Sequence, residues 1–179
     1  MRIIVTTWTV DPAHSDAQFR VKHLMINNVT GEFTSFRVNV ETESDNFASA
    51  QINFEADIAS ISTKNEMRDN HLKSDDFFNA EKFPVISFHG KGITKVKGNE
   101  YVLVGDLTIR DVTKEVSLDV ENGGLMTDFY GNTKAGFEIS GSISRKDFGL
   151  LWNGVTETGG IVVSDIVKLQ LNVQLQKQA

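Results

Sequence analysis

Much of the chain alternates between apolar and polar residues, and this period of two constrains the fold more than any other sequence feature. Over residues 50–58 every second residue is apolar and the residues between them are polar. A similar alternation occurs over 17–25, 36–41, 135–143 and 167–175. Successive side chains of a β-strand point to opposite faces of the sheet, so each segment predicts a strand with one buried and one hydrated face.

Three further strands are predicted near residues 85–93, 101–110 and 113–120. Short segments rich in Gly and Asn, such as 97–99, 122–124 and 130–132, follow or precede them, and tight turns of this kind join antiparallel neighbours. About eight long strands with one polar face favour closure, because a closed barrel has no unpaired edge. The sequence therefore predicts a mainly β protein, an eight-stranded antiparallel barrel that forms a single domain over residues 1–179.

Composition narrows the functional classes. The chain has 179 residues, no cysteine, and 18 Lys and Arg against 24 Asp and Glu, a net charge of −6. The absence of cysteine excludes disulfides and thiol chemistry, and the negative charge argues against binding nucleic acid or an anionic membrane. Neither a membrane-spanning run of roughly 18 apolar residues nor the apolar region of a signal peptide occurs. We expect a cytoplasmic protein without stable membrane insertion.

One stretch breaks the alternation and predicts a helical insert at about 63–82. Thr63 and Glu66 have the spacing of a capping box, and Ser74 is a second candidate N-cap. Pro84 ends the segment. The apolar anchors of the insert are Met67, Leu72, Phe77 and Phe78. A short amphipathic insert of this kind must cover something, and the mouth of the barrel is the expected place.

The inward face of the predicted strands combines phenylalanines with small residues. The small residues are Ala17, Ala50, Ala56, Ala135 and Gly141. An eight-stranded barrel is of a size that side chains can fill or that can hold one ligand. Small residues either leave space for a ligand or complement the bulky side chains across the lumen. The composition favours a hollow interior, and both interpretations stay open at this point.

Several blocks in the chain resemble those of the YceI-like family, in order and over nearly the whole length. They are 8–15 (WTVDPAHS), 19–24 (FRVKHL), 29–33 (VTGEF), 60–63 (SIST), 68–78 (RDNHLKSDDFF), 83–88 (FPVISF), 105–110 (GDLTIR) and 145–149 (RKDFG). Asp111 and Glu115 depart from the family pattern, at places where glycine and proline are common.

The resemblance implies a lipocalin-like barrel with a long apolar lumen that holds a polyisoprenoid chain. The ligand would be a polyprenyl phosphate, or a polyprenyl quinone or its precursor. The resemblance implies no catalytic residue, no cofactor and no metal, and relatives suggest a possible homodimer. We therefore expect a non-catalytic protein that binds, sequesters or transports the lipid, with its tail in the lumen and its head group near the mouth.

The candidate ligand-binding residues come from the apolar faces, the insert and one long loop. They are His14, Ser15, Phe19, His23, Phe36, Phe54, Ile58, Met67, Arg68, His71, Leu72, Phe77, Phe88, Leu107, Phe137, Phe148 and Trp152. Two other functions stay open: an isomerase or cyclase that acts on the same lipid with His23 or His71 as the base, and a stress-response interaction protein in which the lipid only fills the barrel.

The polar candidates each have a structural alternative. His14 and Ser15 either contact a head group or cap a local turn. His23 either belongs to a polar pocket or is a satisfied core residue. Arg68 and His71 share one helical face, where Arg68 either binds a phosphate or belongs to a network that fixes the insert.

The loop at 145–154 is long and contains aromatic residues. Phe148 and Trp152 either contact the lipid at the entrance or pack the loop onto the end of the barrel. The four histidines lack the spacing of common metal sites.

Overall fold

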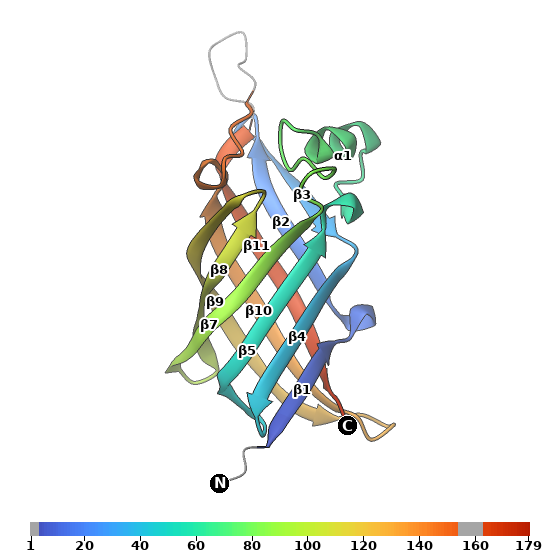
Figure 1. Cartoon of the computed structure of the whole chain (residues 1–179), viewed down its shortest axis with the longest axis vertical. Coiled ribbons are helices and arrows are strands. Elements are labelled where there is room, and N and C mark those ends of the chain that lie inside the picture. The colour runs from blue at the N-terminus through green and yellow to red at the C-terminus, as the bar shows by residue number, and fades with distance from the viewer. Residues whose placement is uncertain (1–3, 154–162) are drawn as a thin grey trace.

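The computed structural model describes residues 4–153 and 163–179 as a tall barrel with one short helix at its end (Figure 1). The strands are β1 (Val5–Val10), β2 (Asp16–His23), β3 (Asn27–Phe33), β4 (Phe36–Glu43), β5 (Asn46–Asp57), β6 (Ile61–Ser62), β7 (Val85–Lys97), β8 (Glu100–Ile109), β9 (Val112–Thr127), β10 (Thr133–Ser144) and β11 (Val163–Lys177). The helix is α1 (Glu66–Lys73), and three 3₁₀ turns are η1 (Pro12–His14), η2 (Ile58–Ser60) and η3 (Arg145–Phe148).

The barrel closes through β1. Antiparallel neighbours follow the order β1-β4-β5-β7-β8-β9-β10-β11, and β1 also pairs with β11. The predicted eight-stranded antiparallel, lipocalin-like barrel is therefore confirmed. The first part of β11 pairs with β2 and its last residues pair with β1, so β1 and β2 lie one after the other along the same strand, separated by η1. β3 and β6 extend the sheet beside β2.

The membership of the barrel differs from the prediction in one respect. The predicted set of eight includes β2 and lacks β1, β3 and β6. β1 reads Val-Thr-Thr-Trp-Thr-Val, and its threonines lie on both faces, with Thr6 buried and Thr7 half-buried. Because threonine counts as polar in a hydropathy pattern and still fits a strand well, the alternation does not reveal this strand.

The insert forms a shorter helix than predicted. α1 has eight residues, and its N-cap is Asn65, whose side chain accepts a hydrogen bond from the Arg68 amide at 3.0 Å. The Thr63 hydroxyl instead donates to Asp69 at 2.6 Å, so Thr63 is not the cap. Ser74 is the C-cap of α1, and no second helix follows it before Val85. Asparagine is among the strongest N-cap residues, which explains the later start.

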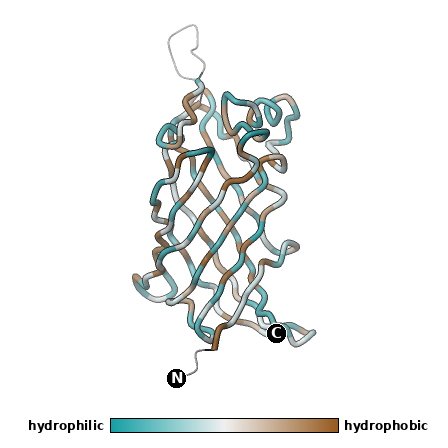
Figure 2. Tube along the Cα trace, in the orientation of Figure 1, coloured by the Kyte–Doolittle hydropathy of each residue, from teal (hydrophilic) through white to brown (hydrophobic). Residues whose placement is uncertain are grey.

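The two ends of the barrel carry different structures. The lid end carries α1, the β2–β3 turn, the β8–β9 turn and η3 (Figure 1). The terminal end carries the N- and C-terminal ends of the described chain and the β4–β5, β7–β8 and β9–β10 hairpins. Along the wall between them, hydrophilic and hydrophobic segments alternate on every strand (Figure 2), which is the expected period of two.

Candidate apolar ligand site

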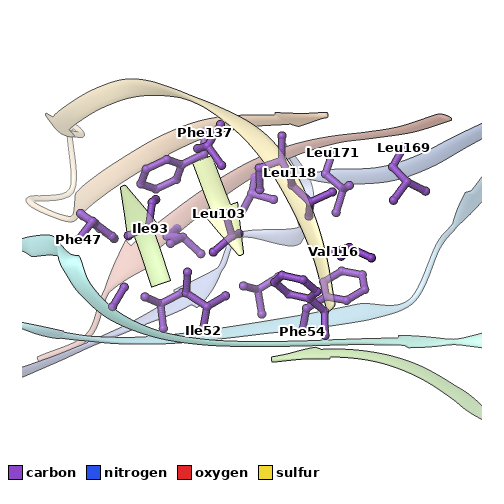
Figure 3. A pocket seen from close by; sticks show the side chains of 18 of the residues that line it. Phe47, Ile52, Phe54, Ile93, Leu103, Val116, Leu118, Phe137, Leu169 and Leu171 are labelled. Atoms are coloured by element: carbon purple, nitrogen blue, oxygen red, sulfur yellow. The ribbon is translucent and has the colours of Figure 1, made fainter. Parts of the chain in front are cut away.

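The barrel encloses a lumen cavity of about 130 Å³ (Figure 3). Every described residue that lines it is apolar, and the residues come from all eight strands except β1. Four predicted site residues are among them: Phe54, Phe88, Leu107 and Phe137. The sequence thus located these four correctly on the inner face, while their contact with a ligand stays a prediction.

The lumen cavity is smaller than the expected long sleeve. An apolar cavity of roughly 150 Å³ is large enough for a benzene-sized molecule. A volume of about 130 Å³ therefore holds about one five-carbon prenyl unit. A longer chain needs more space than this volume, so the open tube expected along the whole barrel stays a prediction.

Small residues play both of the roles that the sequence left open. Ala50 lines the lumen cavity and leaves space. Gly141 complements a bulky neighbour, because a Cβ there would lie 2.6 Å from the Leu118 side chain. A Cβ on Gly105 would overlap the ring of Phe88. Because these glycines have no side chain, Leu118 and Phe88 lie directly against the backbone of the barrel wall. The cavity beside them is narrow but not filled.

A second cavity, the lid cavity, lies at the lid end of the barrel, between β2 and the insert. It measures about 170 Å³. It brings together seven predicted residues from β2, from α1 and its following turn, and from the loop after η3. They are Phe19, His23, Arg68, His71, Leu72, Phe77 and Trp152. The lining also includes Lys22 and Thr63, so this cavity is apolar with a polar rim. Gly154 of the predicted loop lies outside the described residues.

Arg68 and His71 are held within the insert. Arg68 donates from Nε to the Thr63 hydroxyl at 2.8 Å and from Nη2 to the Thr63 carbonyl at 2.9 Å. His71 Nε2 lies 2.8 Å from Asp76 Oδ2, and its ring packs edge-on against Trp152 at 4.7 Å between centroids. These contacts are those of a network that fixes the lid. Within the described residues, Arg68 forms no ion pair with a carboxylate.

Aromatic side chains pack beside the lid cavity. Phe33 lies 5.7 Å from Phe19 and 6.3 Å from Phe78 between ring centroids. Phe33 and Phe78 pack on the core cluster that contains Ile58 and Phe148, which are 1% and 2% exposed. Ile58 and Phe148 were predicted to contact ligand, but they are core residues that line neither cavity. No described residue lines both cavities.

The lumen cavity adjoins another pocket at the terminal end. A terminal-end pocket of about 240 Å³ shares Phe47, Ile93 and Phe137 with the lumen cavity. The rings of Phe47 and Phe137 stand 5.1 Å apart between centroids, and Figure 3 shows both at one end of the cavity with Ile93. The expected mouth beneath the insert stays a prediction, and the terminal-end pocket adds a second approach to the lumen.

Comparison with known proteins identifies the family of this chain. A model of the YceI-like domain matches residues 8–175. The chain belongs to the YceI-like family. It is 39% identical over 171 residues to a UPF0312 protein of Staphylococcus aureus, covering 95% of this chain and 97% of that protein.

Solved YceI-like structures share the fold. A Campylobacter jejuni YceI protein is 34% identical with a TM-score of 0.76, and the match covers 88% of this chain and 90% of that one. Burkholderia cenocepacia BcnA is 23% identical with a TM-score of 0.80, covering 92% and 98%. A polyisoprenoid binding domain from Saccharophagus degradans is 14% identical with a TM-score of 0.73, covering 96% and 98%.

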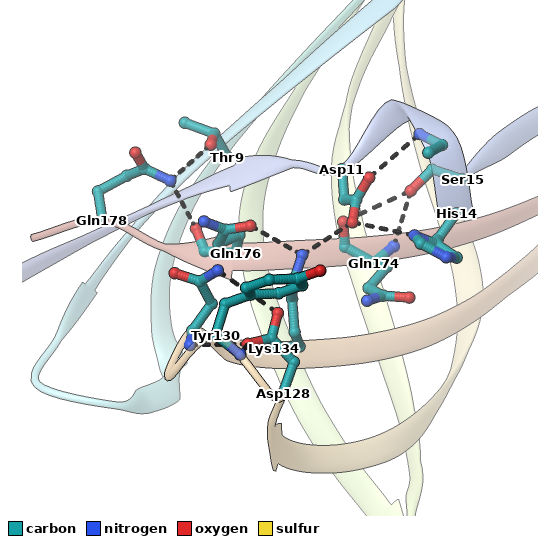
Figure 4. A network of polar contacts seen from close by, with 12 residues as sticks. Thr9, Asp11, His14, Ser15, Asp128, Tyr130, Lys134, Gln174, Gln176 and Gln178 are labelled. Atoms are coloured by element: carbon teal, nitrogen blue, oxygen red, sulfur yellow. Dashed lines mark hydrogen bonds and ion pairs between the residues drawn. The ribbon is translucent and has the colours of Figure 1, made fainter.

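His14 and Ser15 of this YceI-like protein lie on the outer wall (Figure 4). His14 belongs to a clasp with Asp11, Lys134 and Gln176, and the Ser15 hydroxyl accepts a hydrogen bond from the Gln174 amide at 2.9 Å. Lys134 donates to Asp11 at 2.8 Å and to Gln176 at 2.7 Å. His14 Nδ1 lies 3.0 Å from Asp11 Oδ2. The hydrogen bond from Lys134 is the main reason that the pKa of Asp11 falls to about 2. The clasp fixes η1 to β10 and β11, and neither His14 nor Ser15 reaches the lumen cavity or the lid cavity.

Two other candidates also lie away from the cavities. Met67 is 83% exposed on the outer side of α1, so it does not anchor the insert. Phe36 packs against Phe54 at 5.9 Å between ring centroids, on the same face of β4 as Val38 and Val40, but it does not line the lumen cavity. The sequence gives the face of a residue and not its height along the barrel, which is why these positions were not distinguished.

Arg110 fixes the lid and was not predicted to do so. It donates to the carbonyls of Asp75 and Phe77 at 2.9 and 3.0 Å and to the Asp75 carboxylate at 2.8 Å. Arg110 has a φ of +55° in a two-residue turn between Ile109 and Val112, a conformation that costs a non-glycine residue about 1–2 kcal/mol. The unusual Arg110-Asp111 turn was the sequence signal for this clamp.

Arg145 organises the loop that carries Trp152. Its side chain is 3% exposed and donates to the carbonyls of Leu150, Trp152 and Ser164 at 2.6, 2.7 and 2.9 Å. Burial lowers the pKa of Arg145 from its ordinary value, and the carbonyls together with Asp165 at 3.7 Å compensate the buried charge. Arg145 belongs to the family block at 145–149, so the family resemblance was the one sequence feature that pointed to this residue.

Metal-ligating side chains do not gather in the described part of the chain: no group of three or more His, Asp or Glu residues is placed to hold an ion. His14, His71 and His89 have separate partners, namely Asp11, Asp76 and Asn53. None of the helices in the described ranges combines the length and apolar character that crossing a bilayer requires.

Proposed function

We propose that this YceI-like protein binds and carries an isoprenoid lipid, with the prenyl tail in the lumen, and that it does so without catalysing a reaction. The observation that carries the proposal is the fully apolar lumen cavity, enclosed by the barrel wall between Phe54, Phe88 and Leu107. The name of the Saccharophagus degradans neighbour, a polyisoprenoid binding domain, agrees with this ligand class.

The energetics of burial suit such a tail. A five-carbon prenyl unit has on the order of 100 Å² of apolar surface, so its burial contributes about 2 kcal/mol before ordering costs. The first unit fits the existing space of about 130 Å³. Each further unit has to displace lining side chains, which offsets part of this gain. We therefore expect affinity to rise with chain length, by less than about 2 kcal/mol per unit.

The head group is proposed to stay at the terminal end. The terminal-end pocket adjoins the lumen through Phe47 and Phe137, and its polar lining consists of Asp45, Asn46, Tyr101 and Asn122. No cationic side chain lines it among the described residues. Asp45 is paired with Lys177 at 3.0 Å, so this pair adds no net charge, and the amides and the phenol suit an uncharged head group. A polyprenyl quinone, its precursor or a polyprenol is therefore favoured over a polyprenyl phosphate.

An enzyme that uses His23 or His71 as a base is not favoured by the geometry. Both histidines line the lid cavity, and neither of them lines the lumen cavity. A base must come within hydrogen-bond reach of the proton that it removes. A tail held in the lumen cavity is out of reach of either histidine.

A blocking substitution tests the proposal. Ala50→Phe fills the lumen cavity, and Gln51→Phe places the same ring on the outer face of the neighbouring position. Binding of geranylgeraniol, measured by native mass spectrometry and by isothermal titration, should fall at least about tenfold for Ala50→Phe and stay unchanged for Gln51→Phe. Ala50→Leu provides a smaller block if Ala50→Phe does not fold. Equal binding by the folded blocked variant and wild type would contradict the proposal.

A further inference from the structure

The β9–β10 hairpin exposes large apolar side chains at the terminal end of the barrel. Phe129 is 105% exposed and Tyr130 is 90% exposed, more than any other large hydrophobic residue in the described chain. Met126 and Leu125 on the same hairpin are 73% and 53% exposed. Single exposed apolar residues are ordinary, but four on one hairpin are not. Phe129, Tyr130 and Met126 form the hairpin patch, which indicates an interaction surface.

The tip of this hairpin is rigidly held. The Asp128 side chain accepts hydrogen bonds from the amides of Tyr130 and Asn132, both at 2.9 Å, and the Asp128 amide donates to the Asn132 carbonyl at 2.9 Å. Gly131 supplies the left-handed conformation that the turn needs, with a φ of +81°. Because the backbone is already ordered, presenting Phe129 and Tyr130 to a partner has a low entropic cost.

The hairpin also borders the route into the lumen through Leu125, which points to the opposite face of β9 from Met126. Leu125 lines the terminal-end pocket, and that pocket shares Phe47, Ile93 and Phe137 with the lumen cavity. Leu125 therefore connects the hairpin to the pocket that adjoins the interior of the barrel. A lipid that moves along this route keeps its tail in contact with apolar groups.

A bilayer fits this patch better than a second copy of the chain. The exposed side chains offer on the order of a few hundred Å² on a protruding loop, whereas a stable protein interface needs roughly 800 Å² per partner. Aromatic residues, tyrosine above all, favour the boundary between membrane and water. Lys134, paired across the hairpin with Met126, is already bound to Asp11, and Asp128 adds negative charge.

We propose that the β9–β10 hairpin docks on the surface of an electrically neutral phospholipid bilayer through Phe129, Tyr130 and Met126. The bilayer is specified as neutral because the charged groups of this hairpin do not complement anionic lipids. The passage of an isoprenoid from this bilayer into the lumen rests on the function proposed above, but docking itself does not.

The test uses the full chain and vesicles of pure phosphatidylcholine. Phe129→Ser/Tyr130→Ser removes the aromatic tip, and Met25→Ser/Ile26→Ser is the matched control in the β2–β3 turn at the lid end, where both residues are also exposed. In flotation assays we expect wild type and the control to bind the vesicles alike. Binding of the tip variant should fall at least about tenfold, while its unfolding temperature stays unchanged.

Three results would overturn the docking proposal. The first is no binding of wild type to phosphatidylcholine, or binding only when phosphatidylglycerol is added. The second is an equal loss in both double variants. The third is a wild-type dimer, in ultracentrifugation without vesicles, that the tip substitutions dissociate, since the patch would then serve a second copy.

Binding of geraniol, a short isoprenoid that needs no membrane, tests the function of the lumen independently of docking. The tip variant should bind geraniol as wild type does, because Phe129 and Tyr130 do not line the lumen cavity. Loss of vesicle binding together with retained geraniol binding supports docking. Vesicle binding by a protein that takes up no geraniol contradicts the lumen function and leaves docking supported.

Discussion

The two ends of the barrel differ in how they close the lumen. At the lid end, Phe33, Phe78, Ile58 and Phe148 form a packed layer, and the insert lies beyond it. At the terminal end, Phe47, Phe137 and Ile93 line both the lumen cavity and the pocket beside the hairpins. The difference teaches that a helix over one end of a barrel does not by itself mark the entrance. The packing of the side chains beneath it decides where a ligand can pass.

The largest expected effect concerns the rigidity of the lid end. Arg145→Met leaves the carbonyls of Leu150, Trp152 and Ser164 without their donor. We expect a loss of about 3–5 kcal/mol in the free energy of unfolding, measured by urea denaturation at pH 7. Lys146→Met is the control, since Lys146 is half-exposed and contacts only Asp165, and it should cost less than about 1 kcal/mol. A similar cost for both substitutions would show that the buried donor does not hold this end together.

The second prediction compares the two barriers directly. Phe47→Ala thins the terminal-end barrier, and Phe78→Ala thins the lid-end layer. Both remove a half-buried phenylalanine, so both should destabilise the protein by about 2–4 kcal/mol. Uptake of a fluorescent prenyl probe in stopped-flow experiments should become about tenfold faster for Phe47→Ala, which corresponds to about 1.4 kcal/mol of barrier. It should change less than about twofold for Phe78→Ala. Faster uptake by Phe78→Ala alone would place the entrance at the lid end.

The third prediction concerns the clasp that supports the base of the β9–β10 hairpin. Its contacts lower the pKa of Asp11 from 3.8 to about 2, so the ionised clasp stabilises the fold at pH values above 3.8 and loses this effect as pH falls toward 2. With Asp11 and Lys134 only 15% and 13% exposed, the loss should be at most about 2 kcal/mol.

Urea denaturation between pH 5 and pH 2 measures this dependence. Lys134→Gln removes the main cause of the shift, so the part of the acid sensitivity that belongs to Asp11 should diminish in that variant. His14→Gln leaves the Lys134 contact in place and serves as the control. An unchanged stability profile in Lys134→Gln would contradict the role of the ion pair.

The smallest effect is expected for the clamp on the lid. Arg110→Gly removes three hydrogen bonds to Asp75 and Phe77 but relieves the positive φ of 55°. Because these contributions oppose each other, the net loss should be only about 1 kcal/mol. Hydrogen exchange at residues 74–80 should nevertheless become faster, while prenyl uptake through the terminal end stays unchanged. Faster uptake in this variant would contradict the assignment of the entrance.

The strand pattern could be predicted because it depends on local alternation. The faces of β5 and β10 place Phe54 and Phe137 toward the interior, as the lumen cavity has them. β1 could not be recognised, since the threonines of Val5–Val10 hide its buried face, and Trp8, fully buried at 0% exposure, was seen only as part of a family block.

The position of the site along the barrel could not be predicted in the same way. Phe33 and Phe78 meet although they are far apart in the chain, and no local pattern encodes that contact. Met67 was predicted to anchor the insert because its side chain is apolar. In the structure it lies on α1 and is exposed to solvent. His14 and Ser15 were placed at the mouth, and the register of β1, β10 and β11 places them on the outer wall.

A crystal structure of the protein with bound geranylgeraniol tests the central claim most directly. We predict density for the prenyl tail in the lumen between Phe54, Phe88 and Leu107, with new rotamers for the side chains that now narrow the cavity. The hydroxyl group should lie at the terminal end, beyond Phe47 and Phe137. An unchanged lumen with the lipid bound in the lid cavity or on the outer wall would contradict the account.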